Sequence, residues 1–176
     1  MSENNPILQV KDLTVSFNAF AGKVQAVRGV SFDLNKGETL CIVGESGSGK
    51  SVTNKAIMGI LSKNAVIDRG EILYDGMDLT KLTEEQFCQI RGKRIAMVFQ
   101  DPLSALNPIM KVGKQITETL CVHQKLSHEQ AKKRALELMS ACCSCQNLSF
   151  SLSVTNTLIS FISTSEAICL SQTVFW

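Results

Sequence analysis

The stretch that decides the fold runs from residue 44 to residue 51 and reads Gly44-Glu45-Ser46-Gly47-Ser48-Gly49-Lys50-Ser51. It matches the spacing glycine, four residues, Gly-Lys, then Ser or Thr at every fixed position. The glycines allow the backbone to curl so that its N–H groups point inward at an anion. Before it, residues 39–43 form an apolar run that predicts a strand buried on both faces, and after it a helix is predicted from Lys50 to about Leu61. A strand, this loop and a helix in that order are the context that a phosphate-binding loop requires.

The end of the stretch carries the groups that a nucleoside triphosphate needs. We expect Lys50 to reach the β- and γ-phosphates and the hydroxyl of Ser51 to ligate Mg²⁺. The backbone amides from Gly44 to Val52 and the positive end of the following helix should bind phosphate oxygens. The alternative is a glycine-rich turn without a ligand.

Composition limits the class of protein. The chain has 176 residues, of which 44% are hydrophobic, enough for one core of ordinary domain size. Its net charge of +2 gives no field that would attract nucleic acid. Residues 1–6 are polar and no apolar segment follows, so no export signal is expected. No apolar run reaches the roughly 18 residues that a membrane-spanning helix needs.

The seven cysteines and two histidines do not predict a metal site. Cys41, Cys88 and Cys121 are interpreted as reduced thiols, because no export signal is present. A second group consists of Cys142, Cys143 and Cys145. It could bind zinc only with a fourth ligand at suitable spacing, and Cys169 lies far along the chain. The histidines, His123 and His128, are expected at surface positions of helices.

Hydrophobic alternation and turn residues predict the strands. They lie at Leu8–Phe17, as either a pair of short strands or one strand with a bulge at Lys11-Asp12, and at Val30–Leu34, Gly70–Tyr74 and Ile95–Phe99. The pair Asp75-Gly76 predicts a tight hairpin turn after the third of these.

Capping boxes and a four-residue repeat predict the remaining helices. The box Thr83–Gln86 opens a short helix to about Arg91, and the box Ser127–Gln130 opens one to about Met139. A helix between them is predicted over Val112–Gln124. This mixture of elements indicates an α/β domain with a flanking helical portion.

Several motifs together resemble the ATP-binding subunits of ABC transporters, in particular the oligopeptide and dipeptide importer branch. They are Val27–Phe32, Gly37–Leu40, Val43–Ser51 and the run Val98-Phe99-Gln100-Asp101-Pro102-Leu103-Ser104-Ala105-Leu106-Asn107-Pro108. The resemblance covers about residues 6–139 and is more specific for the ABC class than for peptide import. Relatives that handle nickel or another small solute share much the same motifs.

The resemblance implies roles for two further residues. Phe17 lies where an aromatic ring stacks on adenine, with a core phenylalanine at a strand end as the alternative. Gln100 matches a glutamine that touches Mg²⁺ or water and senses the membrane partner, with a solvated loop glutamine as the alternative. The segment Asp101–Pro108 resembles the surface that contacts the membrane subunit.

Three motifs of a complete ABC ATPase do not occur in the sequence. They are a signature resembling Leu-Ser-Gly-Gly-Gln, an apolar strand ending in Asp-Glu, and a switch histidine. The chain is therefore expected to be truncated after about residue 139, to fold marginally and to hydrolyse ATP poorly. From Leu138 to Trp176 only Glu166 is charged, where average composition predicts roughly ten charged residues. Residues 140–176 are expected to be a disordered or frameshifted tail.

The sequence thus predicts the N-terminal half of a P-loop NTPase of the ABC type, with an antiparallel β subdomain and the start of a helical subdomain. Its expected parts are a core over about 6–110, helices over about 111–139, and the tail. The resemblance implies ATP and Mg²⁺ as cofactors, permease subunits and a second ATP-binding subunit as partners, no nucleic acid, and a cytoplasmic position on the inner face of the cell membrane. The alternatives are a non-catalytic fragment or pseudogene product, and another P-loop enzyme such as a kinase or GTPase.

Overall fold

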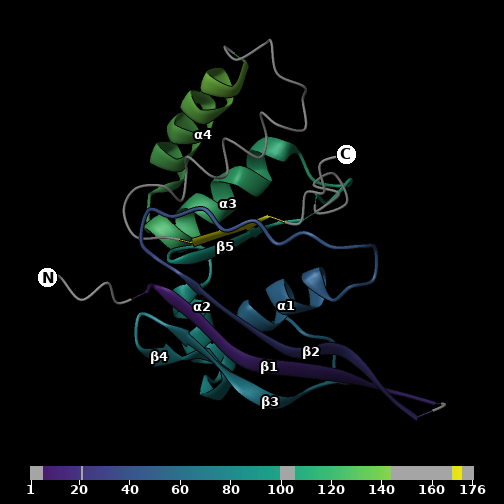
Figure 1. Cartoon of the computed structure of the whole chain (residues 1–176). Helices are drawn as coiled ribbons and strands as arrows, with labels where there is room; N and C mark the ends of the chain where they lie inside the picture. The colour runs from purple at the N-terminus through teal and green to yellow at the C-terminus, as the bar shows by residue number, and fades with distance from the viewer. Residues whose placement is uncertain (1–5, 21, 100–105, 144–167, 172–176) are drawn as a thin grey trace, which may run out of the picture. The chain divides into compact units, whose positions relative to one another are not determined.

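The computed structural model describes residues 6–20, 22–99, 106–143 and 168–171 (Figure 1). The chain divides into two compact units, Met1–Arg91 and Gly92–Trp176. The first unit contains an antiparallel sheet, the predicted phosphate loop and two short α-helices. The second contains a parallel strand pair and two longer helices. This architecture confirms the predicted α/β class.

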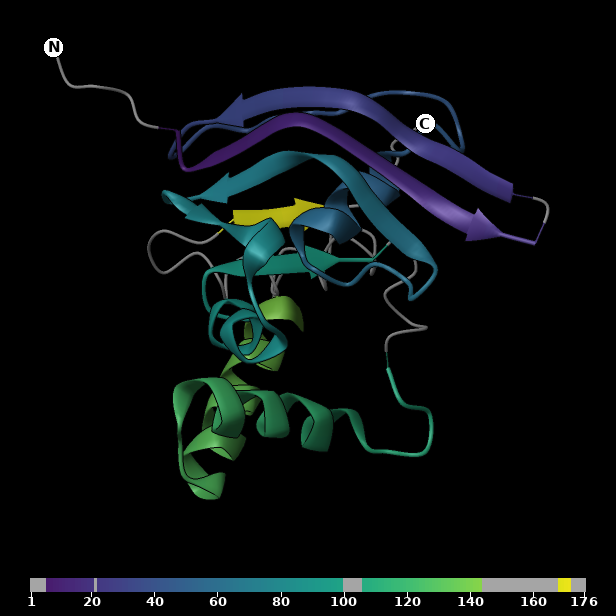
Figure 2. The ribbon, with the colours of Figure 1, turned by 90° about the horizontal axis from the view of Figure 1, so that it is seen from below.

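The first unit is organised by a four-stranded antiparallel sheet with the order β2-β1-β3-β4. Figure 2 shows its three long strands side by side. The strands are β1 (Leu8–Ala19), β2 (Gly22–Leu34), β3 (Ala65–Tyr74) and β4 (Met77–Asp78). The second and third begin earlier than the sequence predicts. Their added residues are largely exposed and carry no alternating apolar pattern that could reveal them.

Residues 8–17 lie in one strand with a bulge at Lys11-Asp12, so this alternative is confirmed and the pair of short strands is not. Val10 pairs with Phe32 and Leu13 with Val30, so two residues of β1 lie opposite one residue of β2. Three positions separate Val10 from Leu13, and a regular strand would turn them to opposite faces. The extra residue and the positive φ of 49° at Asp12 return both side chains to the buried face.

The same bulge explains why position 70 of β3 is glycine. Gly70 has a φ of +103°. A β-carbon there would lie 2.6 Å from the carbonyl oxygens of Lys11 and Asp12 and 2.6 Å from the Cα of Leu13. Because all three contacts are backbone atoms, no side-chain movement could relieve them.

The hairpin turn and the first capping box form where the sequence predicts them. Asp75 and Gly76 have φ values of 49° and 76° between the paired residues Tyr74 and Met77, as a type I′ hairpin turn requires. A short 3₁₀ helix, η1 (Leu79–Lys81), follows β4. Helix α2 (Glu84–Ile90) begins with both reciprocal hydrogen bonds of the Thr83–Gln86 capping box.

Helix α1 (Lys50–Ile57) is shorter than the predicted span to about Leu61. Gly59, at φ 64°, ends it, since its N–H donates to the carbonyl of Ala56 while that of Ile60 donates to the carbonyl of Lys55. This pair of bonds is a Schellman ending, which favours glycine at its left-handed position. Ala56 and Ile57 are buried, as are the core residues of the sheet, among them Leu8, Val10, Leu13, Val15, Ile72 and Tyr74.

The prediction of a buried strand over residues 39–43 is wrong. None of the strand ladders of the described residues includes this segment, and Figure 1 draws it as a coil between β2 and α1. Leu40 and Ile42 are each 41% exposed and Val43 is 87% exposed. A strand buried on both faces depends on neighbouring strands that bond its backbone and cover its side chains. An apolar run cannot supply either by itself.

In the second unit, β5 (Ile95–Val98) pairs in parallel with β6 (Ile168–Ser171). The predicted helix over Val112–Gln124 is confirmed as α3, and α4 spans His128–Cys143, four residues beyond the predicted end. Ser127 and Gln130 exchange both bonds of the second capping box. A small core of Leu120, Ala131 and Ala135 joins the two helices.

The strand β6 falls within the stretch for which the sequence pattern predicts no regular structure. Its four residues therefore depart from that expectation. The domain boundary near residue 139 and the frameshifted or disordered nature of residues 140–176 stay predictions. The cysteines from Cys142 onward have no described side chains, so the interpretation of that group lies outside the described residues. Among the helices that the structure describes, none has the length and hydrophobicity to cross a membrane.

Candidate functional site

The predicted phosphate loop leads directly into α1. Gly49 is the residue before the helix and takes a left-handed conformation, with φ 90° and ψ −2°. The N–H of Ser48 donates to the carbonyl of Glu45 at 3.2 Å, which closes a tight turn inside the loop. The N–H and the hydroxyl of Thr53 both donate to the carbonyl of Gly49, at 2.9 Å and 3.1 Å. These bonds join the loop to the first turn of the helix.

Lys50 places its ammonium group within the curl of the loop. Its Nζ donates to the carbonyl oxygens of Gly44 and Glu45 at 2.5 Å and 2.7 Å, and to the hydroxyl of Ser48 at 3.2 Å. The positive charge therefore lies at the N-terminal end of α1, where the unpaired N–H groups of the first helical turn already favour an anion. The first turn of α1 contains no acidic residue that would oppose this field.

The glycines of the loop fit a group that needs close backbone approach. A β-carbon at Gly44 would lie 2.7 Å from the hydroxyl oxygen of Ser48 and 3.8 Å from Nζ of Lys50, so a side chain there would fill the curl. Gly49 meets backbone instead, since a β-carbon would lie 2.6 Å from the carbonyl oxygen of Ala26. Gly47, at φ +80°, has no atom within 4 Å of its β-carbon position and borders open space. The residues present thus suit a phosphate chain lying on the loop.

The remaining loop residues lie open to solvent. The exposed residues are Glu45, Ser46, Gly47, Ser48 and Ser51. Val52 is half-buried at the third position of the helix. An exposed serine hydroxyl at the helix start is available to a hydrated Mg²⁺ ion, which binds through oxygen ligands. The assignment of these residues to nucleotide and metal stays a prediction.

Phe17 lies near the end of β1, between Val24 of β2 and Ala65 of β3. Its side chain is half-buried, and Val24 beside it is 57% exposed. Phe17 is therefore not part of the buried core, which disfavours the alternative of a core phenylalanine. Stacking on adenine stays a prediction.

Gln100 and Asp101–Ala105 lie outside the described residues, so the proposed roles of Gln100 in metal binding and signalling stay predictions. The described chain before them ends with Val98, which is buried in β5, and Phe99, which is 41% exposed.

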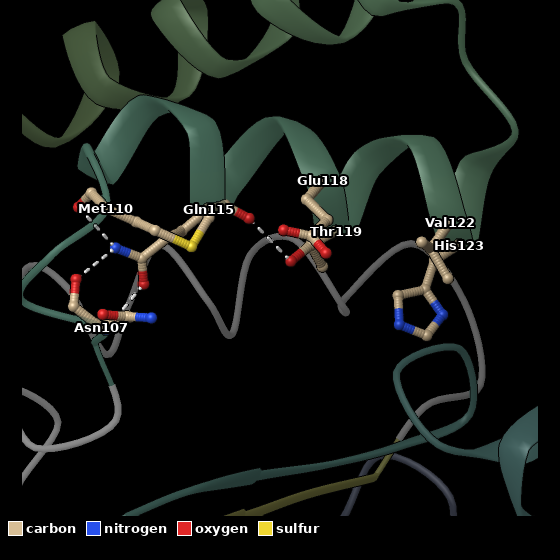
Figure 3. A pocket seen from close by; sticks show the side chains of 7 residues that line it. All are labelled: Asn107, Met110, Gln115, Glu118, Thr119, Val122 and His123. Carbon is tan, nitrogen blue, oxygen red and sulfur yellow. Dashed lines mark hydrogen bonds between the residues drawn. The ribbon is translucent and has the colours of Figure 1, made fainter.

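A second feature, in the other unit, is an open cavity of about 390 Å³ along α3. Figure 3 shows the residues that line it, Asn107, Met110, Gln115, Glu118, Thr119, Val122 and His123. The side-chain amide of Gln115 accepts from the N–H of Asn107 at 2.9 Å and donates to the carbonyls of Asn107 and Met110 at 3.0 Å and 2.9 Å. These three bonds tie the segment after residue 106 to α3. His123, at the far end of the cavity, is half-buried, whereas His128 is exposed.

The sequence did not reveal two contacts of the loop. The carbonyl of Ala26 lies where only glycine fits at position 49, but Ala26 is far from the loop in sequence and gives no signal of this contact. The bond from the Thr53 hydroxyl to the carbonyl of Gly49 could have been expected only weakly, because Ser and Thr hydroxyls in helices often bond the carbonyl four residues earlier. No cluster of three or more metal-ligating side chains occurs within the described parts of the chain.

Comparison with known proteins gives one family. The profile described as "ABC transporter" matches residues 27–158, which includes the phosphate loop and extends past residue 139. Over 134 residues the chain is 59% identical to the oligopeptide transport ATP-binding protein OppD of Bacillus subtilis (strain 168), covering 76% of this chain and 37% of that protein. It is 57% identical to the dipeptide transport ATP-binding protein DppD of Lactococcus lactis, covering 76% and 38%. The chain spans about two fifths of the length of these relatives.

A solved structure shows the same fold. It is described as a dimeric, post-hydrolysis state of an ATP-binding cassette bound to ADP and Pi. The TM-score is 0.71 and the sequence identity 22%, over 93% of this chain and 72% of the other. At that identity the likeness concerns the arrangement of the backbone.

Proposed function

This chain belongs to the ABC transporter family, and on that basis we propose that it binds ATP through residues Gly44–Val52. The observation that carries the proposal is the position of Lys50, whose ammonium group lies within a glycine curl at the N-terminus of α1. A cation and a helix N-terminus meet there, and each favours a phosphate chain. The relatives described as ATP-binding proteins support ATP as the nucleotide.

Each loop residue has a distinct part in the proposed binding. Lys50 exchanges its contacts with the carbonyls of Gly44 and Glu45 for oxygens of the β- and γ-phosphates. The backbone amides of the loop and of Ser51 and Val52 bind the remaining phosphate oxygens. The hydroxyl of Ser51 would ligate Mg²⁺, an ion that would neutralise phosphate charge, and the resemblance assigns the amide oxygen of Gln100 to the same ion. Phe17 offers a flat apolar ring to adenine.

For the whole protein we propose the ATP-binding subunit of an importer of peptides or similar small solutes. The names of the relatives, oligopeptide and dipeptide transport ATP-binding proteins, support this class of solute. The partners would be transmembrane permease subunits and a second ATP-binding subunit, as the dimeric solved cassette suggests. The protein would then act on the cytoplasmic face of the membrane.

For these 176 residues we propose ATP binding without efficient hydrolysis. The sequence contains no match to the signature motif or to an apolar strand ending in Asp-Glu, which the resemblance assigns to the partner's nucleotide and to the attacking water. A positioned general base contributes about 10²–10⁴ in rate, so residual turnover should be low.

The test of ATP binding compares two lysines of α1. Lys50→Ala should weaken ATP affinity at least about tenfold, since hydrogen bonds to charged groups contribute about 1.5–3 kcal/mol. Lys55→Ala, in the last turn of the same helix, is the matched control and should change affinity less than about twofold. Titration calorimetry with Mg²⁺ and ATP measures both. Equal effects of the two substitutions, or wild-type protein that binds no ATP, would contradict the proposal.

A further inference from the structure

Arg91, the last residue of the first unit, bonds to two separate parts of that unit. Its Nε donates to the carbonyl of Met58 at 2.8 Å, and its Nη2 donates to the carbonyl of Gly59 at 2.9 Å. The same guanidinium donates to both carboxylate oxygens of Glu84, at 2.5 Å and 3.2 Å. The side chain of Arg91 is only 20% exposed, whereas that of Glu84 is 71% exposed.

The aromatic ring of Phe87 also contacts the guanidinium of Arg91. The guanidinium carbon of Arg91 lies 4.6 Å from the centre of the Phe87 ring, within the range of a cation–π interaction. Phe87 is buried and packs so closely on Gly59 that a β-carbon there would lie 2.5 Å from the ring. Arg91 and Phe87 therefore both contact the turn at Met58 and Gly59, and Glu84 holds the guanidinium of Arg91 in place.

That turn is the C-terminal end of α1. The carbonyls of Asn54, Lys55 and Ala56 accept from the amides of Met58, Ile60 and Gly59. The carbonyls of Met58 and Gly59, just past the helix, accept from Arg91. The guanidinium also brings positive charge to the end of the helix where the macrodipole is negative. The far end of α1 is thus fixed by backbone and side-chain bonds together.

α1 is short, so its two ends cannot move independently. It has eight residues, which corresponds to about 12 Å along its axis. A helix of this length is not stable alone and takes its position from what holds it. Its N-terminal end carries Lys50 and the loop, and the bond from the amide of Thr53 to the carbonyl of Gly49 connects the two.

We propose that Arg91 is a positioning residue for the phosphate loop. By fixing the C-terminal end of α1 to Glu84 and Phe87 of α2, it sets where the N-terminal end presents Lys50 and the loop amides. In this proposal Arg91 acts through α1 and does not itself contact the nucleotide. The inference rests on the proposed function only in naming ATP as the ligand that the loop would hold.

The test separates positioning from general stability. Amide hydrogen exchange is measured on the 176-residue chain and its variants at Met58, Gly59 and Ile60, at Ser48 and Thr53 of the loop and first turn, and at residues of the β1–β3 ladder. The variants are Arg91→Gln, which removes the charge and the fork of donors, and Arg91→Lys, which keeps the charge. Arg69→Gln is the control, since Arg69 also forms a bidentate pair, with Asp12, but lies 68% exposed on the sheet. ATP affinity is measured for all four proteins.

Arg91→Gln should raise exchange about tenfold at the end of α1 and at Ser48 and Thr53, leave the β1–β3 ladder unchanged, and weaken ATP binding about three- to tenfold. Arg91→Lys should recover part of both effects, and Arg69→Gln should change neither. Faster exchange that is uniform across the unit, or confined to the end of α1 with unchanged ATP affinity, would overturn the proposal. If wild-type protein binds no ATP, the proposed function fails, and exchange at Ser48 and Thr53 still decides whether Arg91 positions the loop.

Discussion

Two apolar regions of the first unit differ in structure, because one forms a buried sheet and the other an exposed coil. In the antiparallel sheet, the side chains of Leu8, Val10, Ile72 and Tyr74 are at most 1% exposed. In residues 39–43, an equally apolar run forms no strand, and Val43 is 87% exposed. The difference shows that an apolar run becomes a strand only where another strand pairs with it.

The source of the partner strands separates the two regions. β1 and β2 adjoin in sequence, as do β3 and β4, so their antiparallel pairs need only tight turns. A strand before a phosphate loop is expected to pair in parallel, and parallel partners come from distant parts of a chain. Among the described residues, β5 forms its ladder with β6, and no ladder reaches residues 39–43.

The largest effect is expected at the bulge that lets the sheet form. Gly70→Ala should destabilise the first unit by about 2–5 kcal/mol, because it combines a left-handed φ with three backbone contacts at 2.6 Å. Gly37→Ala is the control. It has a φ of +78° but open space around it, and should cost only about 1–2 kcal/mol. Urea denaturation measures both, and equal losses would show that the bulge geometry does not constrain position 70.

A pair of isoleucine truncations tests the comparison itself. Ile72→Ala removes a fully buried side chain of the sheet and should cost about 2–5 kcal/mol. Ile42→Ala changes a side chain that is 41% exposed and should cost less than about 0.5 kcal/mol. Chemical denaturation followed by circular dichroism gives both values. If the two losses were similar, residues 39–43 would be buried in solution.

A smaller effect is expected where structure is specified locally. Thr83→Ala removes the side-chain acceptor of the capping box and should destabilise the first unit by about 1 kcal/mol. Thr83→Ser keeps the hydroxyl and should remain within a few tenths of a kcal/mol of the wild type. Thermal unfolding compares them. A loss in Thr83→Ser as large as in Thr83→Ala would indicate packing of the methyl group instead of capping.

Sequence reasoning succeeded where the signal was local. The bulge at Lys11-Asp12, the turn at Asp75-Gly76 and both capping boxes depend on residues within a few positions of one another. The family and the α/β class followed from the phosphate loop and its companion motifs, and the comparisons confirm both.

The errors had two physical causes. Residues 39–43 were expected to form a strand because the pattern reveals hydrophobicity but not the pairing partner. The predicted span of helix α1 runs to about Leu61 and is too long. Gly59 gives a local signal for the end of the helix, because glycine is preferred in a left-handed helix ending.

The residues of the candidate site also differ in how far the sequence predicts them. The curl of the loop and the place of Lys50 could be expected from spacing alone, whereas their use in binding ATP stays a prediction. Arg91 could not be found from sequence, because the carbonyls of Met58 and Gly59 meet it only after α1 and α2 pack together.

The smallest expected effect is a dependence of the sheet on acid. Hydrogen bonds from Lys23 and then from Ser16 lower the pKa of Asp68 below its ordinary value of 3.8, so Asp68 links β1, β2 and β3. A carboxyl whose folded pKa is depressed adds stability above its unfolded pKa and loses it as the pH falls through the folded pKa. The first unit should therefore lose stability below about pH 4, and Asp68→Asn should flatten part of that loss.

Ser16→Ala provides the graded control, because it removes one of the two bonds and should flatten the acid dependence less than Asp68→Asn does. Both are measured as the midpoint of urea denaturation between about pH 2 and pH 6, the range that spans the unfolded pKa of a carboxyl. An acid profile that Asp68→Asn leaves unchanged would show that the link among the three strands contributes nothing in solution. In that case the stability of the sheet would come from its buried apolar face. The difference between the sheet and residues 39–43 would then be explained by strand pairing and apolar packing, with no contribution from the Asp68 ion pair.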